Sequence, residues 1–174
     1  IIVAGATPAA ERAPDGLTYD SAENKLSVRI SNVFCNDDSS GAPYPARVTV
    51  TLGDKSYRGC GGEPAALVLG EWRLTEIAGA AVAPGSTASI GFDDQGLVYG
   101  STSCNRYSGK YALTPERLTF NTLTATATAC ADPALMAQER RLLDRLQAAD
   151  RFDIGADGPL VLYSGGKEAL RAPR

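Results

Sequence analysis

Histidine is absent from the 174 residues, and no two cysteines have Cys-x-x-Cys spacing. Without histidine the chain lacks the usual general base, the usual proton shuttle and the commonest zinc ligand. A Ser-His-Asp or Cys-His catalytic centre therefore cannot form within this sequence. These absences favour a protein that is not an enzyme, and we expect no metal site and no cofactor.

Long apolar runs and basic clusters are also missing, and the formal net charge is only −3. A membrane-spanning helix needs about 18 or more consecutive apolar residues. Nucleic-acid binding needs a basic patch that faces the phosphates. We therefore expect no transmembrane helix and no nucleic-acid partner, and the length suits one large domain or two small ones.

The N-terminal region has no periodic pattern. Residues 1–16 are rich in alanine, proline and glycine, which predicts a flexible segment. The sequence begins with Ile1 instead of methionine. We read it as a mature or trimmed chain from which a secretory or lipoprotein signal has been removed.

Residues 17–62 have the pattern of a small antiparallel β-meander. Apolar and polar residues alternate over 26–30 and 48–52, and a turn then leads into a third strand at 55–58. Cysteines lie at comparable ends of neighbouring strands in this region, namely Cys35 and Cys60.

The four cysteines form an even set, which favours structural pairing in an oxidising compartment. Cys35 and Cys60 are plausible partners because of their positions on adjacent strands. Such a bond would staple a sheet that is otherwise marginally stable.

Residues 63–69 are interpreted as a linker, and 70–174 as a second domain. This domain contains about eight short strands with turn signals every eight to twelve residues, as in an antiparallel barrel or sandwich. One amphipathic helix is predicted from Asp132-Pro133 to about Ala149, where aspartate can cap and proline fits the first turn. The predicted fold is mainly β, with a single helix that covers one open side of the sheet.

Several segments of the second domain occur in an order typical of one known family. They are Trp72-Arg73-Leu74, Gly100, Ser103-Cys104-Asn105-Arg106-Tyr107-Ser108-Gly109, Leu118-Thr119-Phe120, the segment that ends at Cys130, the helix with Glu139, and Leu160-Val161-Leu162. Together they resemble the META domain (HslJ-like) family over residues 70–171. Residues 17–62 resemble part of a cysteine-containing envelope module often found beside META domains, which makes a fragment of a longer protein one expectation.

The resemblance implies a bacterial protein of the periplasm or outer membrane that is linked to stress and antibiotic tolerance. It implies no catalytic activity. The META fold also resembles the lipid-holding pilot proteins of type III secretion, so a lipid or hydrophobic-ligand carrier is the alternative function. We expect a monomer whose partner is an envelope protein or a lipid.

The Gly100–Gly109 stretch is the most informative motif. Gly100 and Gly109 are expected to allow bends or bulges at strand ends. Asn105 tolerates a left-handed backbone and can bond nearby amides, and Tyr107 combines an apolar ring with a polar tip.

Two interpretations of this motif remain open. In the structural one, a Cys104–Cys130 bond cross-links a loop corner, and Arg106 is tied to carbonyls or a carboxylate. In the functional one, Arg106 is the centre of a small anion or partner site. A hydrolase that uses a carboxylate pair is disfavoured, because the adjacent pairs Asp37-Asp38 and Asp93-Asp94 lie in turns expected to be solvated.

Overall fold

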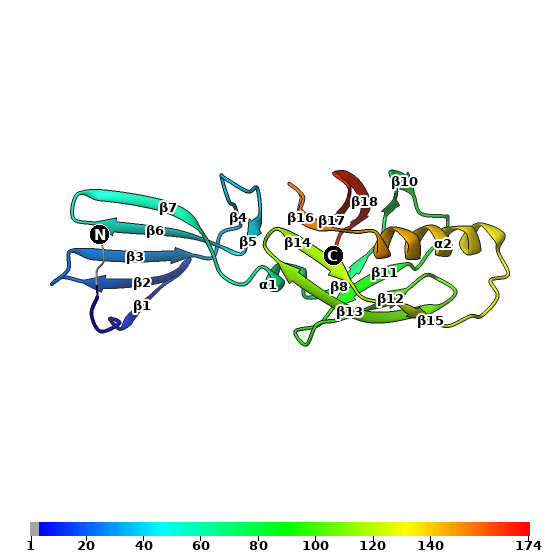
Figure 1. Cartoon of the computed structure of the whole chain (residues 1–174), viewed down its shortest axis with the longest axis horizontal. Coiled ribbons are helices and arrows are strands. Elements are labelled where there is room, and N and C mark those ends of the chain that lie inside the picture. The colour runs from blue at the N-terminus through cyan, green and yellow to red at the C-terminus, as the bar shows by residue number, and fades with distance from the viewer. Residues whose placement is uncertain (1–3) are drawn as a thin grey trace. The chain divides into compact units, whose positions relative to one another are not determined.

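A computed structural model describes residues 4–174, and residues 1–3 of the expected flexible segment lie outside the described part. The chain divides into two compact units, residues 1–64 and 65–174 (Figure 1). Both consist mainly of antiparallel strands, as predicted, although the described strands form open sheets instead of a closed barrel.

The first unit is a five-stranded antiparallel sheet in the order β1-β2-β3-β6-β7, accompanied by a two-stranded ribbon. The strands of the sheet are β1 (Ala10–Ala13), β2 (Gly16–Ser21), β3 (Leu26–Ser31), β6 (Ala46–Leu52) and β7 (Lys55–Gly61). The ribbon pairs β4 (Cys35–Asn36) with β5 (Pro43–Tyr44).

Strand β1 corrects the expectation that residues 1–16 are irregular throughout. It pairs along its whole length with β2, from Ala10 opposite Tyr19 to Ala13 opposite Gly16. Its side chains are mostly exposed, so the strand depends on backbone pairing and carries no apolar alternation. That is why the sequence pattern missed it.

The sheet of the first unit has little core. Its apolar side chains, such as Val28 opposite Tyr19 and Val50, are only half-buried. Within the described part of the unit, the buried side chains belong to small residues: Cys35, Ala42, Pro43, Ala46 and Pro64. A disulfide joins Cys35 to Cys60 with a Cα–Cα distance of 5.6 Å.

The second unit packs two antiparallel sheets and a long helix around one core. The first sheet contains β8 (Gly70–Arg73), β11 (Ser89–Phe92), β12 (Leu97–Ser101), β13 (Arg106–Thr114), β14 (Arg117–Phe120) and β15 (Thr124–Ala125). The second contains β9 (Glu76–Ile77), β10 (Ala80–Ala81), β16 (Arg151–Ile154), β17 (Leu160–Ser164) and β18 (Lys167–Ala172). The helices are α1 (Ala65–Val68) and α2 (Pro133–Gln147).

Helix α2 begins where the sequence predicted, because the Asp132 carboxylate accepts a hydrogen bond of 2.8 Å from the Ala134 amide and Pro133 follows the cap. Its buried face includes Leu142 and Leu146, which join the core formed by the two sheets. The largest fully buried core side chains are Trp72, Phe92, Phe152, Leu74, Ile77, Ile90, Leu118, Leu142, Leu146, Leu160, Leu162 and Leu170.

The short helix α1 lies in the segment that was expected to be a linker. Val68 is fully buried, and its carbonyl accepts a 2.7 Å hydrogen bond from the Trp72 indole. The apolar run is too short to show helical periodicity, so its packing role becomes visible only through Trp72. No helix in residues 4–174 has the length and apolar character needed to cross a bilayer.

Candidate functional site

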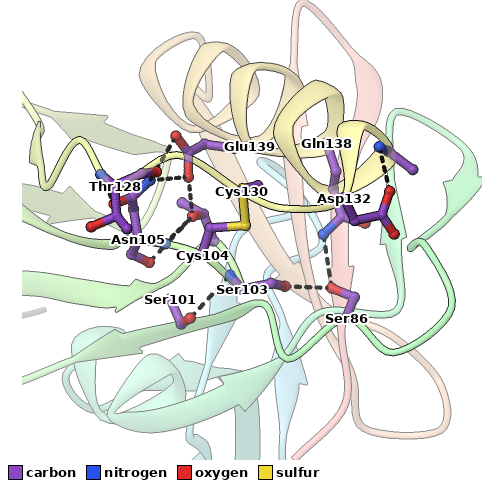
Figure 2. The surroundings of a disulfide bond; sticks show 12 residues. Ser86, Ser101, Ser103, Cys104, Asn105, Thr128, Cys130, Asp132, Gln138 and Glu139 are labelled. Atoms are coloured by element: carbon purple, nitrogen blue, oxygen red, sulfur yellow. Dashed lines mark hydrogen bonds between the residues drawn. A yellow bond between two sulfur atoms is a disulfide. The ribbon is translucent and has the colours of Figure 1, made fainter.

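The turn between β12 and β13 is anchored to the segment that precedes α2. A disulfide joins Cys104 in the turn to Cys130, with a Cα–Cα distance of 5.6 Å (Figure 2). The bond brings together two parts of the chain that are 26 residues apart. Each disulfide lies within a single unit, and the two bonds close loops of similar length.

Asn105 is a structural residue whose side chain is almost fully buried. It is 3% exposed. Its side-chain amide donates to the Thr128 carbonyl (2.9 Å) and to the Glu139 carboxylate (2.9 Å). Its carbonyl oxygen accepts from the Thr126 hydroxyl (2.7 Å) and the Thr128 amide (2.8 Å). The full hydrogen-bonding capacity of the side chain is therefore used internally.

Helix α2 contributes two polar side chains that hold this corner. Figure 2 shows Glu139 reaching towards Asn105 and Gln138 reaching towards Ser86. Glu139 also accepts a hydrogen bond from the Thr102 hydroxyl. Gln138, which is fully buried, donates to the Ser86 hydroxyl at 2.7 Å, and Ser86 in turn lies 2.9 Å from the Ser103 hydroxyl.

Sequence reasoning assigned no role to Gln138 or Thr102, and it named Glu139 only as part of the helix that resembles the family. Gln138 offered a signal, because it shares the helix face of Leu142, four residues later, and a polar residue on a buried face requires a partner.

Tyr107 and Gly100 form a second structural unit across strands β12 and β13. Tyr107 is 3% exposed and donates a 2.8 Å hydrogen bond to the Ser89 carbonyl. Burial raises the pKa of its phenol above the ordinary value, and the negative charge of Glu71 adds to the effect. The Tyr107 side chain therefore packs in the core, and its hydroxyl is used within the sheet.

Neither glycine of the motif makes the expected bend. Gly100 lies opposite Tyr107 inside paired strands, and Gly109 lies inside β13 opposite Val98. A Cβ on Gly100 would lie 2.2 Å from the Ser89 carbonyl oxygen, and one on Gly109 would lie 2.7 Å from the Leu123 side chain. Glycine is therefore needed at these two positions because neighbouring groups approach too closely for a side chain. The backbone conformation itself does not require glycine.

Gly100→Ala is expected to destabilise the second unit by about 3 kcal/mol, because the clash involves a backbone oxygen that cannot rotate away. Urea unfolding followed by the fluorescence of Trp72 measures the effect. Ser108→Ala, at an exposed position on the neighbouring strand β13 of the same unit, is the control. Equal effects of the two substitutions would show that the close approach at Gly100 carries no energetic weight.

Arg106 has an orientation opposite to that of its neighbours in the motif. Because side chains alternate along a strand, burial of Tyr107 places Arg106 on the outer face of the sheet, where it is exposed. Its guanidinium makes no hydrogen bond or ion pair with any residue in the range 4–174. The expected tie of Arg106 to carbonyls or a carboxylate is therefore wrong.

The outer face of this sheet forms an open groove of about 890 Å³ beside Arg106. Nine of the fifteen lining residues carry a hydroxyl, and Glu71 supplies the one carboxylate among them. The lining residues are Glu71, Thr87, Ser89, Tyr99, Gly100, Ser101, Ser103, Cys104, Asn105, Arg106, Tyr107, Ser108, Thr124, Ala125 and Thr126.

A smaller pocket of about 350 Å³ shares part of this lining and extends the groove. It includes Glu71, Thr87 and Ser89 and adds two cations, Arg73 and Arg174. Arg174 lies over the Trp72 ring, 4.4 Å from its centroid. The extended groove thus contains one carboxylate, many hydroxyls and three arginines, of which Arg174 is held over the Trp72 ring.

The adjacent carboxylate pairs stabilise turns. Asp37 accepts hydrogen bonds from the hydroxyls and amides of Ser39 and Ser40, which lower its pKa to about 2. Asp93 accepts from the amides of Gln95 (2.9 Å) and Leu97 (2.7 Å). Neither pair is among the residues that line the groove.

Solved structures share this fold. An NMR structure of a protein from Burkholderia xenovorans is similar at 27% identity and a TM-score of 0.52, covering 63% of this chain and 85% of its own. A second NMR structure is similar at 25% identity and the same TM-score, covering 64% of this chain and 95% of its own. A comparison with curated proteins found no match.

The family model of the META domain matches residues 65–174, the whole of the second unit and more than half of the chain. The match begins at α1, five residues before the boundary expected from the sequence. The chain belongs to the META domain family.

Proposed function

We propose that this protein is a non-enzymatic binding protein of the bacterial envelope that supports stress or antibiotic tolerance, and that the groove beside Arg106 is its binding site. Membership of the META family supports the link to stress. Two disulfides and no free cysteine among the described residues support an oxidising compartment such as the periplasm or the outer-membrane surface.

The main support for the proposal is Arg106, whose exposed guanidinium lies beside an open groove and has no partner among the described residues. The polar groups of the Asn105 and Tyr107 side chains bond within the unit, whereas the Arg106 guanidinium keeps its five donors for a ligand. General acid–base catalysis usually needs positioned proton donors and acceptors near the reacting atoms. Glu71 is the single carboxylate lining the groove, which supports binding in preference to catalysis.

The lipid-carrier alternative has less support. The space between the sheets is occupied by core side chains such as Trp72, Phe92 and Phe152, each at most 2% exposed. Polar and apolar surface line the groove in nearly equal amounts, whereas a hydrophobic ligand would favour a mainly apolar lining.

Complementation of a deletion strain tests the proposal. Arg106→Ala is expected to lower survival under envelope stress to near that of the deletion, whereas Glu71→Gln retains most of the protection. Arg141→Ala, an exposed arginine on α2, is the matched control and is expected to behave like the wild type. If Glu71→Gln abolished the protection while Arg106→Ala gave wild-type survival, the result would favour catalysis over binding. Cell fractionation of the complemented strain checks the envelope location.

A further inference from the structure

The register of the first sheet of the META unit aligns two arginines across the groove. Arg73 pairs with Ser89, Ser89 with Ser101, and Ser101 with Arg106. Paired residues on one face of a sheet point the same way, so these four side chains form a row. Three strand spacings of about 4.8 Å place the two arginine backbones about 14 Å apart, with serine hydroxyls between them.

The neighbouring row on the same face contains a different set of groups. Glu71 pairs with Gly91, Gly91 with Tyr99, and Tyr99 with Ser108. A Cβ on Gly91 would lie 2.5 Å from the Tyr99 ring, so the ring lies against the bare glycine backbone. Tyr99 is 36% exposed. The glycine therefore positions an accessible aromatic ring on the sheet.

These two rows have the chemistry of a site for a charged sugar. We propose that the groove binds an anionic oligosaccharide with phosphate or carboxylate groups near both ends; this rests on the function proposed above. Arg73 and Arg106 bind the separated anionic groups through charge-assisted hydrogen bonds. Tyr99 stacks on the apolar face of a sugar ring, and Glu71 with the serine and threonine hydroxyls binds sugar hydroxyls.

The arginines are free to do this. Neither Arg73 nor Arg106 has a side-chain hydrogen bond or ion pair with the residues that the structure describes. A small anion would need one of them and would leave Tyr99 unused. An acidic peptide or a nucleic acid would use the cations, but a row of hydroxyls on a chain of net charge −3 favours a shorter, polyhydroxylated ligand.

Isothermal calorimetry on the full chain tests the proposal with a glucosamine disaccharide that bears one phosphate on each sugar. Arg73→Ala and Arg106→Ala are each expected to weaken binding about tenfold and to reduce its salt dependence. Tyr99→Ala is expected to weaken binding several-fold with the salt dependence unchanged. Arg141→Ala is the control and is expected to bind as the wild type.

The unphosphorylated disaccharide and inorganic phosphate are each expected to bind at least tenfold more weakly. The proposal is overturned if phosphate alone binds as well, if Arg106→Ala has no effect, or if an acidic peptide or a single-stranded oligonucleotide binds more tightly at Arg106. Vesicles that display the same sugar on a lipid distinguish the source: equal affinity indicates a free saccharide, and tighter binding to vesicles indicates a glycolipid headgroup.

A parallel NMR titration with a solubilised envelope extract distinguishes a failure of the sugar proposal from a failure of the proposed binding function. Amide shifts in β11–β13 with the extract but none with the disaccharide would overturn the sugar class and leave the binding function standing. Absence of shifts with both would overturn the binding function as well.

Discussion

Reduction of the disulfides at neutral pH is expected to unfold the first unit while the META unit remains folded. The first unit buries only small side chains, and its apolar face stays half-exposed. A bond that closes a loop of 25 residues stabilises by about 3–4 kcal/mol in the chain-entropy model. That amount is comparable to the whole stability expected of a thin sheet with little core.

The META unit loses a similar contribution from Cys104–Cys130 but retains a core formed by both sheets and α2. It is therefore expected to be less stable after reduction and still folded. Trp72 is the only tryptophan, so its fluorescence reports this unit alone. Hydrogen exchange of the segment 16–61 reports the first unit.

Two paired substitutions separate the contributions of the bonds. The double substitution Cys35→Ser and Cys60→Ser should give the first unit the same rapid hydrogen exchange that reduction is expected to cause. It should leave Trp72 fluorescence unchanged. Cys104→Ser with Cys130→Ser should lower the urea midpoint of the META unit only. Unfolding of both units by either pair would show that the units depend on each other for stability.

Asn105→Ala is expected to destabilise the META unit by about 3 kcal/mol. The substitution removes all five side-chain hydrogen bonds of Asn105. It deprives the Thr128 amide and carbonyl of their side-chain partner and leaves Glu139 with the Thr102 hydroxyl alone in a part-buried corner. Urea unfolding followed by Trp72 fluorescence measures the loss.

Asn121→Ala provides the matched control, because Asn121 is exposed and makes no side-chain hydrogen bond with the described residues. Its effect is expected to stay within about 0.5 kcal/mol. A loss of less than 1 kcal/mol for Asn105→Ala would mean that water replaces the missing groups. The corner would then owe its stability to the Cys104–Cys130 bond instead.

Alternation and turn chemistry were enough to predict the strands at 26–30 and 48–52, the α2 start at Asp132 and the mainly β architecture. These signals are local, because each depends on residues a few positions apart. Strand β1 and helix α1 gave no such signal, since one is an exposed edge and the other is a single short turn.

The site was harder to predict because it depends on contacts between distant residues. The hydrogen bond between Asn105 and Glu139 joins positions 34 apart, and the alignment of Arg73 with Arg106 needs the register of four strands. The opposite orientations of Arg106 and Tyr107 were within reach, because strand alternation alone puts neighbouring side chains on opposite faces.

The two ends of the META unit lie side by side. The Arg73 amide donates to the Pro173 carbonyl at 3.0 Å, and the Arg174 guanidinium donates to the Leu69 carbonyl while it stacks on Trp72. Adjacent ends allow a folded module to be spliced into a surface loop of another protein without pulling the host strands apart. The META unit therefore has a geometry that allows it to be inserted within another chain as readily as it can follow another domain.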